Sequence, residues 1–231
     1  MKPEIILALD LDSLKKAKQL VNKLYPVIKT FKVGSQLFTA CGPEVINVIN
    51  KKGAKVFLDL KFFDIPNTVA HAVRNATRLK VKMLTLHILG DEEMIKAAVF
   101  AARDEAKRSG VKRPLLIGVT VLTSKETKSS DVLTLARIGI ECGLDGVVCS
   151  AQEVKMLKEK IKRKFIIVTP GIRPRGSSVN DQKRTATISE AVKAGSSFLV
   201  VGRPILDAKD QNAAAREMAG EIDDRRDKRP N

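Results

Sequence analysis

The sequence has little of what several common classes of protein require. Its 231 residues include no tryptophan, one tyrosine and eight phenylalanines. None of these aromatic residues is interleaved with a basic run, as a surface that stacks on nucleic-acid bases requires. No stretch approaches the roughly 18 to 20 apolar residues of a membrane-spanning helix. The N-terminus also lacks the apolar core and the cleavage site of a secretion signal. We therefore expect no membrane association and no specific nucleic-acid partner.

Cysteine is also scarce. Cys41, Cys142 and Cys149 are odd in number and show no CxxC spacing, which is typical of reduced residues in a cytoplasmic protein. We therefore expect neither a disulfide framework nor a metal cluster. Basic residues, in contrast, are abundant, with 42 Lys and Arg against 26 Asp and Glu and a net charge of +16. We interpret this excess as a solvated basic surface, which would also attract a small anionic substrate.

Short apolar runs recur along the chain and indicate the strands of a buried parallel sheet. They are rich in Val, Ile and Leu and mostly lack strict alternation, as strands that are covered on both faces do. The predicted strands are 5–9, 27–33, 55–60, 83–89, 115–122, 146–149, 165–168 and 198–201.

Segments with helical spacing alternate with these runs. The predicted helices are 13–24, 43–50, 68–79, 92–108, 132–142, 151–161, 189–194 and 213–222. Glycines follow several of them, at Gly53, Gly110, Gly143 and Gly195, where a left-handed residue commonly ends a helix. A strand followed by a helix, repeated eight times, predicts a single (β/α)8 TIM barrel over residues 1–222. We expect residues 223–231 to form a charged, frayed tail.

The barrel hypothesis also locates the active site. Active sites of such barrels lie at the C-terminal ends of the strands, and phosphate often binds after strands 7 and 8. Charged residues and a glycine lie at or just after the ends of five of the predicted strands, namely Asp10, Lys32, Asp59 with Lys61, Arg173, and Gly202 with Arg203. The residues after the last two strands suit phosphate, since arginine matches its oxygens bidentately and glycine lets backbone N–H groups come close.

The strongest chemical pattern is Asp-x-Lys-x-x-Asp at residues 59–64. Asp59 and Lys61 are two positions apart on one strand and should point the same way. Lys32, at the end of the adjacent strand, can approach Asp59, and Asp64 follows after a short step. Two carboxylates would keep the lysines charged, and one ammonium could donate a proton to a developing carbanion. The alternative interpretation is a solvated charge cluster that only stabilises the fold.

These residues resemble the orotidine 5′-phosphate decarboxylase family. The run FLDLKFFDIPNT at 57–68 is similar to the signature of the family. Further segments agree in order and spacing: ALD at 8–10, FKVG at 31–34, VLTS at 121–124, TPGIRP at 169–174, DQKR at 181–184 and VGRPI at 201–205. The resemblance extends from about residue 4 to about residue 220. It implies decarboxylation of orotidine 5′-phosphate to uridine 5′-phosphate, with neither a metal nor an organic cofactor.

The resemblance also implies roles for individual residues. Lys61 would protonate C6 of the pyrimidine, and Asp59 would stress the substrate carboxylate. Lys32 would complete the charge network and, with Asp10, hold the ribose hydroxyls. The remaining contacts would come from Thr123 or its neighbour Ser124 on the pyrimidine edge, and from Arg173, Gln182, Gly202 and Arg203 on the 5′-phosphate. The segment 174–183 would form a loop that closes over the ligand.

In the family, the residues matching Asp64 and Thr68 enter the site of the neighbouring subunit, so a homodimer is implied as the catalytic unit. Two positions depart from the family pattern. Phe63 stands where many bacterial members have His, and HILGD at 87–91 replaces the common HASGG. We therefore interpret His87 as a structural residue of the rim.

Two other functions remain open. One is a magnesium-dependent sugar-phosphate decarboxylase or aldolase of the same barrel type, such as a 3-keto-gulonate-phosphate decarboxylase or a hexulose-phosphate synthase. Those enzymes typically have Glu where this chain has Lys32, and a lysine there opposes a magnesium site. The other is a catalytically inactive barrel that binds nucleotides or nucleic acid through its basic surface, which the intact charge array disfavours.

Overall fold

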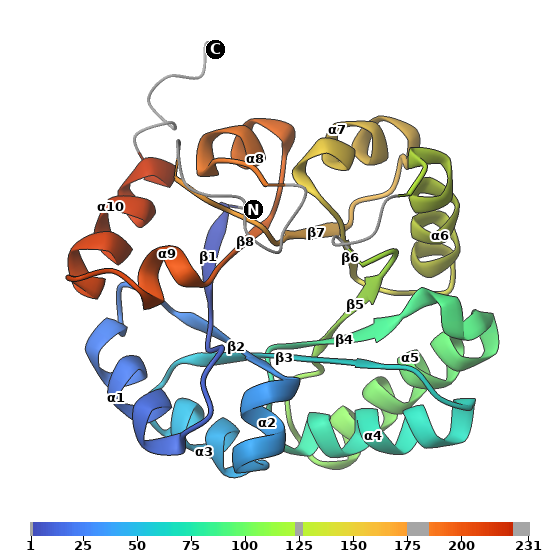
Figure 1. Cartoon of the computed structure of the whole chain (residues 1–231). Coiled ribbons are helices and arrows are strands. Elements are labelled where there is room, and N and C mark those ends of the chain that lie inside the picture. Colours follow the sequence, from blue (N-terminus) through green and yellow to red (C-terminus); the bar gives the residue numbers. More distant parts are fainter. Residues whose placement is uncertain (1, 123–126, 175–184, 224–231) are drawn as a thin grey trace.

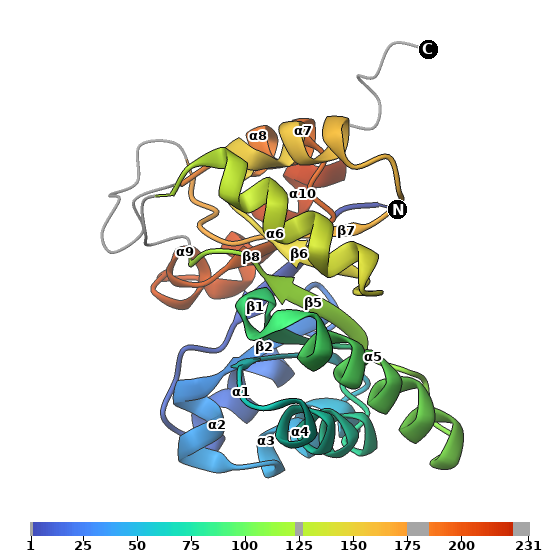
Figure 2. The same cartoon turned by 90° about the vertical axis from the view of Figure 1, so that its right-hand side faces the viewer.

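The computed structural model describes residues 2–122, 127–174 and 185–223. Its parallel strands form a closed barrel in the order β1-β2-β3-β4-β5-β6-β7-β8, and β8 pairs with β1. Helices surround the barrel on the outside, as Figure 1 shows along the barrel and Figure 2 from the side. The predicted (β/α)8 TIM barrel is therefore confirmed.

The strands lie close to the predicted apolar runs. They are β1 Glu4–Ala8, β2 Thr30–Gly34, β3 Lys55–Phe62, β4 Met83–His87, β5 Leu115–Val119, β6 Gly146–Val148, β7 Ile166–Thr169 and β8 Phe198–Val201. The predicted fifth strand was too long, because Val121 and Leu122 lie beyond the end of β5 and line a cavity instead.

The predicted helices are present, with small differences at their ends. They are α1 Leu14–Leu24, α3 Glu44–Lys51, α4 Pro66–Arg78, α5 Asp91–Arg108, α6 Ser129–Glu141, α7 Ala151–Lys160, α8 Ile188–Ala194 and α10 Gln211–Asp223. Three short elements were not predicted from the sequence, namely α2 Ser35–Cys41, the 3₁₀ turn η1 Ile88–Gly90 and α9 Arg203–Leu206. The expected tail lies outside the described residues from 224 onward.

Local signals explain where individual helices begin and end. Ser13 accepts a hydrogen bond from the backbone N of Lys16 at the start of α1. Thr187 and Glu190 form a reciprocal capping box at the start of α8, which satisfies two N–H groups that have no partner within the helix. Gly195 ends α8 with φ 104°, a conformation that favours glycine.

Two layers of apolar side chains form the core. The larger layer lies between the barrel and its helices and includes Phe31, Ile46 and Leu84. The smaller layer fills the barrel interior with residues from six strands, namely Ile6, Ala8, Phe57, Met83, Ile117, Val168, Phe198 and Val200. Side chains from these strands therefore pack the interior of the barrel.

A polar cluster lies at the N-terminal ends of the strands, opposite the expected active site. Lys82 Nζ is 2.9 Å from Glu4 Oε2 and 3.1 Å from Thr30 Oγ1, and Thr30 also donates to Glu4. The same ammonium lies 4.8 Å from the centre of the Phe198 ring, a favourable cation–π contact. The cluster ties β1, β2 and the residue before β4 together at this end of the barrel.

Candidate active site

A cavity of about 490 Å³ lies at the C-terminal ends of the strands. Of the residues predicted from the sequence, its walls contain Asp10, Lys32, Asp59, Lys61, Arg173, Gly202 and Arg203. Valines from neighbouring strands, among them Val119, Val148, Val168 and Val200, supply an apolar wall. The cavity thus combines charged groups with a surface that can pack against a planar ring.

Four predicted residues are not among those that line the cavity in the described structure. Asp64 and Thr68 are exposed at the start of α4, and the Asp64 carboxylate accepts a hydrogen bond from the N–H of Ile65 at 2.7 Å. Thr123 and Gln182 lie outside the described residues, as do Ser124 and almost all of the predicted loop 174–183.

Lys32 and Lys61 bracket the carboxylate of Asp59. Lys61 Nζ is 2.9 Å from Asp59 Oδ1, and Lys32 Nζ is 3.5 Å from Asp59 Oδ2. Lys32 Nζ also lies 3.3 Å from Asp10 Oδ1. The side chains of Asp59 and Lys32 are only 13% and 14% exposed. The result is a continuous row of alternating charges across three adjacent strand ends.

The row of charges determines the protonation of Asp59. Burial by itself would raise the pKa of this carboxyl group, but the positive charges of Lys32 and Lys61 lower it. Hydrogen bonds from Lys61 and Thr85 lower it further, so that the net pKa lies below its ordinary value. Asp59 therefore presents a fixed negative charge next to Lys61.

Lys61 does not continue a regular strand. Leu58 pairs with Leu84, but the next pair joins Phe62 to Leu86, so β3 contains extra residues opposite β4. Within this irregularity, Lys61 adopts φ 51°, which costs a residue with a side chain about 1 kcal/mol or more. Asp59 and Lys61 do contact each other, as strand alternation predicted, but the backbone between them is bulged. Such an irregularity often marks a functional position.

Thr85 in β4 supports the irregularity and was missed by the sequence analysis. Its hydroxyl accepts a hydrogen bond from Lys61 N at 2.9 Å and donates one to Asp59 Oδ1 at 3.0 Å. The side chain is fully buried. The available signal was a polar residue within the apolar run Met83–His87, but it does not by itself identify the partners of the hydroxyl.

Gly34, at the end of β2, leaves room for the Lys32 ammonium. A Cβ atom at this position would lie 3.2 Å from Lys32 Nζ, closer than almost all real contacts of a Cβ atom. Lys32 reaches both Asp10 and Asp59 from this place, and a side chain at position 34 would require its ammonium to shift by a few tenths of an ångström.

His87 lies at the end of β4, near the charged row but outside the cavity lining. Its ring packs against Phe63, with 5.5 Å between the ring centres. Burial lowers the pKa of His87, and the charge of Lys61 lowers it further, although Asp59 acts in the opposite direction. Its Nδ1 atom is buried and has no hydrogen-bond partner in the part of the chain that the structure describes. The interpretation of His87 as a rim residue stays a prediction.

Two arginines, which follow β7 and β8, also line the cavity. Arg173 follows β7 and is buried, with 8% of its surface exposed. Gly202 follows β8 and precedes the short helix α9, which begins at Arg203. A Cβ atom at Gly202 would make only ordinary contacts with Asp10 and Ala8, so the protein side of Gly202 does not demand glycine. This end of the cavity has the charge and the backbone geometry that suit a phosphate.

The described residues hold neither a metal-binding cluster nor a membrane-spanning helix. They contain no group of three or more His, Cys, Asp or Glu side chains that is arranged to hold a metal ion. Within the same ranges, every helix is too short or too polar to cross a membrane.

Comparison with known proteins identifies the family. Residues 3–218 match the model of the orotidine 5′-phosphate decarboxylase / HUMPS family. The chain belongs to this family. It is 44% identical to the orotidine 5′-phosphate decarboxylase of Moorella thermoacetica, over 96% of this chain and 93% of that protein. It is 45% identical to the enzyme of the same name from Syntrophomonas wolfei, over 95% of this chain and 98% of that protein.

Solved structures of family members have the same fold. The orotidine 5′-phosphate decarboxylase of Lactobacillus acidophilus matches with a TM-score of 0.82 and 37% identity, over 95% of this chain and 98% of that one. The enzyme from Pyrococcus horikoshii matches with a TM-score of 0.78 at 22% identity, over 95% of this chain and 99% of that one, which shows the shared barrel alone.

Proposed function

We propose that this protein decarboxylates orotidine 5′-phosphate to uridine 5′-phosphate, the last step in making a pyrimidine nucleotide de novo. The observation that carries the proposal is that the row Asp10–Lys32–Asp59–Lys61 lines the same cavity as Arg173 and Arg203. The names of its relatives support the same reaction. The protein would thus be a carboxy-lyase.

In the proposed reaction, the bond between C6 of the pyrimidine and its carboxyl carbon breaks. Carbon dioxide leaves, the electron pair stays at C6, and Lys61 donates the proton that completes uridine 5′-phosphate. The ammonium of Lys61 stabilises the developing negative charge, because it is already held in place by Asp59. The charge of Asp59 opposes the substrate carboxylate and favours its departure.

Binding of the remaining substrate groups follows from the same cavity. Asp10 and Lys32 would hold the ribose hydroxyls, and Arg173, Gly202 and Arg203 would bind the phosphate, with Thr123 and Gln182 as further predicted contacts. Because the phosphate lies far from the bond that breaks, its binding energy can position the ring over the lysines. This chemistry requires neither a metal ion nor an organic cofactor.

We propose a homodimer as the catalytic unit, with Asp64 and Thr68 serving the site of the partner subunit. Both residues are exposed and do not line the cavity of their own chain in the described structure. Phe63 and Ile65 flank Asp64 in the sequence and are 60% and 66% exposed. Leu89, in the turn η1 that follows β4, is 59% exposed. Exposed apolar side chains near Asp64 and Thr68 are what a subunit interface at this place requires. The free cysteines Cys41, Cys142 and Cys149 support a cytoplasmic location.

The decisive experiment is a decarboxylation assay with and without a chelator. Purified protein should convert orotidine 5′-phosphate to uridine 5′-phosphate at the same rate in EDTA as in buffer. Lys61→Ala should lose nearly all activity, because C6 then lacks its proton donor. The matched control is Lys55→Ala, since Lys55 is an exposed lysine at the other end of the same strand.

The other two functions predict different results. Loss of activity in EDTA, with recovery on adding Mg²⁺, would favour the magnesium-dependent sugar-phosphate enzymes of the same family. No turnover by the folded wild-type protein would favour a barrel that only binds nucleotides. Substantial activity in Lys61→Ala would refute its assignment as the proton donor.

A further inference from the structure

The bulge in β3 places Lys61 next to Asp59, but the strand ladder cannot hold it there. Between the pairs Leu58–Leu84 and Phe62–Leu86, the residues of β3 have no regular partner in β4. Lys61 also has a left-handed backbone at φ 51°. Its geometry must therefore be maintained by something other than backbone pairing.

The hydroxyl of Thr85 takes the place of the missing pairing. It accepts from the backbone N of Lys61 at 2.9 Å, as a strand carbonyl would. It also donates to Asp59 Oδ1 at 3.0 Å, and the same oxygen receives Lys61 Nζ at 2.9 Å. The hydroxyl thus holds both ends of Lys61, the backbone directly and the ammonium through Asp59.

We propose that Thr85 is a positioning residue for the reaction, whose hydroxyl holds the Lys61 ammonium and the Asp59 carboxylate in their reactive arrangement. Thr85 is fully buried and does not line the described cavity, so it acts through its two partners and not on the substrate. A hydroxyl can serve both partners at once, since it has one donor and two acceptor positions. The proposal rests on the proposed function for its effect on turnover.

The test separates the effect of the hydroxyl from the effect of the side chain's shape. Thr85→Val keeps the shape of the side chain and its preference for strands, while Thr85→Ser keeps the hydroxyl. Thr85→Val should lower kcat roughly ten- to a hundredfold, the scale of one lost hydrogen bond to a buried charged group, and leave KM within about threefold. Thr85→Ser should restore most of kcat.

Thr77→Val is the matched control. Thr77 is equally buried, and its hydroxyl donates to Val73 O within α4, away from the cavity. The Thr77→Val variant should have the kcat of the wild type, even if it is somewhat less stable. Should Thr85→Val fail to fold, Thr85→Ala and Thr85→Ser form a second pair that differs by the hydroxyl only.

A second measurement does not depend on catalysis. The amide hydrogen of Lys61, followed by NMR hydrogen exchange, should exchange faster in Thr85→Val than in the wild type or Thr85→Ser. Unchanged kcat and unchanged exchange in Thr85→Val would overturn the proposal, and so would equal losses of kcat in the Thr85 and Thr77 variants. If the wild type does not turn over, the proposed function fails, and the exchange rates alone decide whether Thr85 positions Lys61.

Discussion

The split site can be tested by mixing two inactive variants. Lys61 lines the cavity of its own chain, whereas Asp64 is exposed outside it. Lys61→Ala and Asp64→Ala should each be nearly inactive as pure dimers. In a mixed dimer, however, one of the two sites combines the intact Lys61 of one chain with the intact Asp64 of the other. Random mixing makes half of the dimers mixed, and half of their sites are intact, so activity should recover to about a quarter of the wild-type value.

The assay is decarboxylation by the two variants co-expressed with different tags, compared with each variant alone. The control pairs Lys61→Ala with Asp59→Ala. These residues belong to one cavity, 2.9 Å apart, so every site of that mixed dimer lacks one of them and no activity should return. If Lys61→Ala and Asp64→Ala form dimers without any recovery, Asp64 serves its own chain and the split site is wrong.

Two further predictions concern the phosphate end of the cavity and the outer helices. Arg203→Ala should lower kcat/KM for orotidine 5′-phosphate roughly ten- to a hundredfold but change the turnover of phosphate-free orotidine little. Arg216 is an exposed arginine on α10, and the control Arg216→Ala should affect neither substrate. Equal losses on both substrates in Arg203→Ala would contradict the assigned phosphate contact. Hydrogen bonds from Arg78 and Ser109 lower the pKa of Glu105 to about 2 from its ordinary 4.5. The charged carboxylate of Glu105 therefore stabilises the fold above about pH 4.5, and this stabilisation is lost as the pH falls toward 2. Glu105→Gln should therefore be less stable than the wild type in urea unfolding at pH 7, and the difference should shrink below pH 4.5; a difference independent of pH would count against this account.

The barrel could be predicted because its strands are apolar on both faces. Eight such runs, separated by segments with helical spacing, indicate the topology without any information on contacts. The short helix α9, Arg203–Leu206, was missed because its four residues are too few to show a helical period. Helix α2, Ser35–Cys41, was missed because it buries only Leu37 and so shows no apolar stripe. The fifth strand was predicted too long for another reason, because Leu122 is apolar where it lines the cavity and not a strand.

The charged residues of the site could be predicted because each lies at or just after the C-terminal end of a strand, and strand ends converge in a barrel. The local backbone could not. Sequence spacing suggested a regular strand from Asp59 to Lys61, whereas the structure has a bulge with a left-handed lysine. The group that supports this bulge, Thr85, lies 24 residues beyond Lys61, and no local pattern connects the two.

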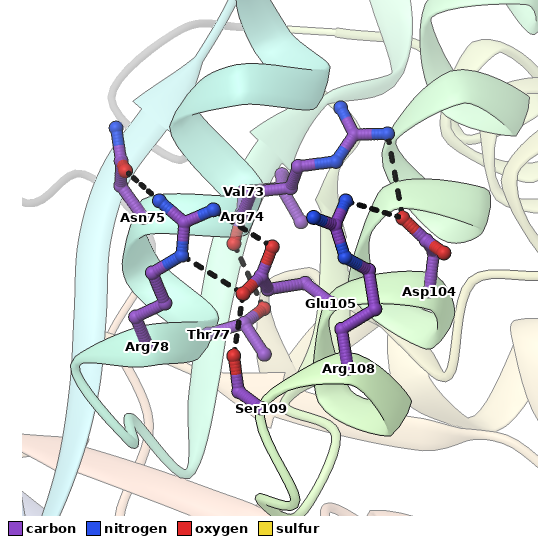
Figure 3. Close-up of polar contacts among 9 residues, drawn as sticks. All are labelled: Val73, Arg74, Asn75, Thr77, Arg78, Asp104, Glu105, Arg108 and Ser109. Atoms are coloured by element: carbon purple, nitrogen blue, oxygen red, sulfur yellow. Dashed lines mark hydrogen bonds and ion pairs between the residues drawn. The ribbon is translucent and has the colours of Figure 1, made fainter.

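The helices outside this bulge carry a polar contact network of their own. Glu105 of α5 receives hydrogen bonds from Arg78 of α4 at 2.8 and 2.9 Å, and Asp104 lies within 4 Å of both Arg74 and Arg108 (Figure 3). These helices follow β3 and β4, the two strands whose ladder is interrupted at the site. On this side of the barrel, the Thr85 hydroxyl connects β4 to β3. Ion pairs connect the two helices α4 and α5 that cover these strands. Between β3 and β4, a side chain thus supplies the connection that backbone pairing supplies between the other strands of the barrel.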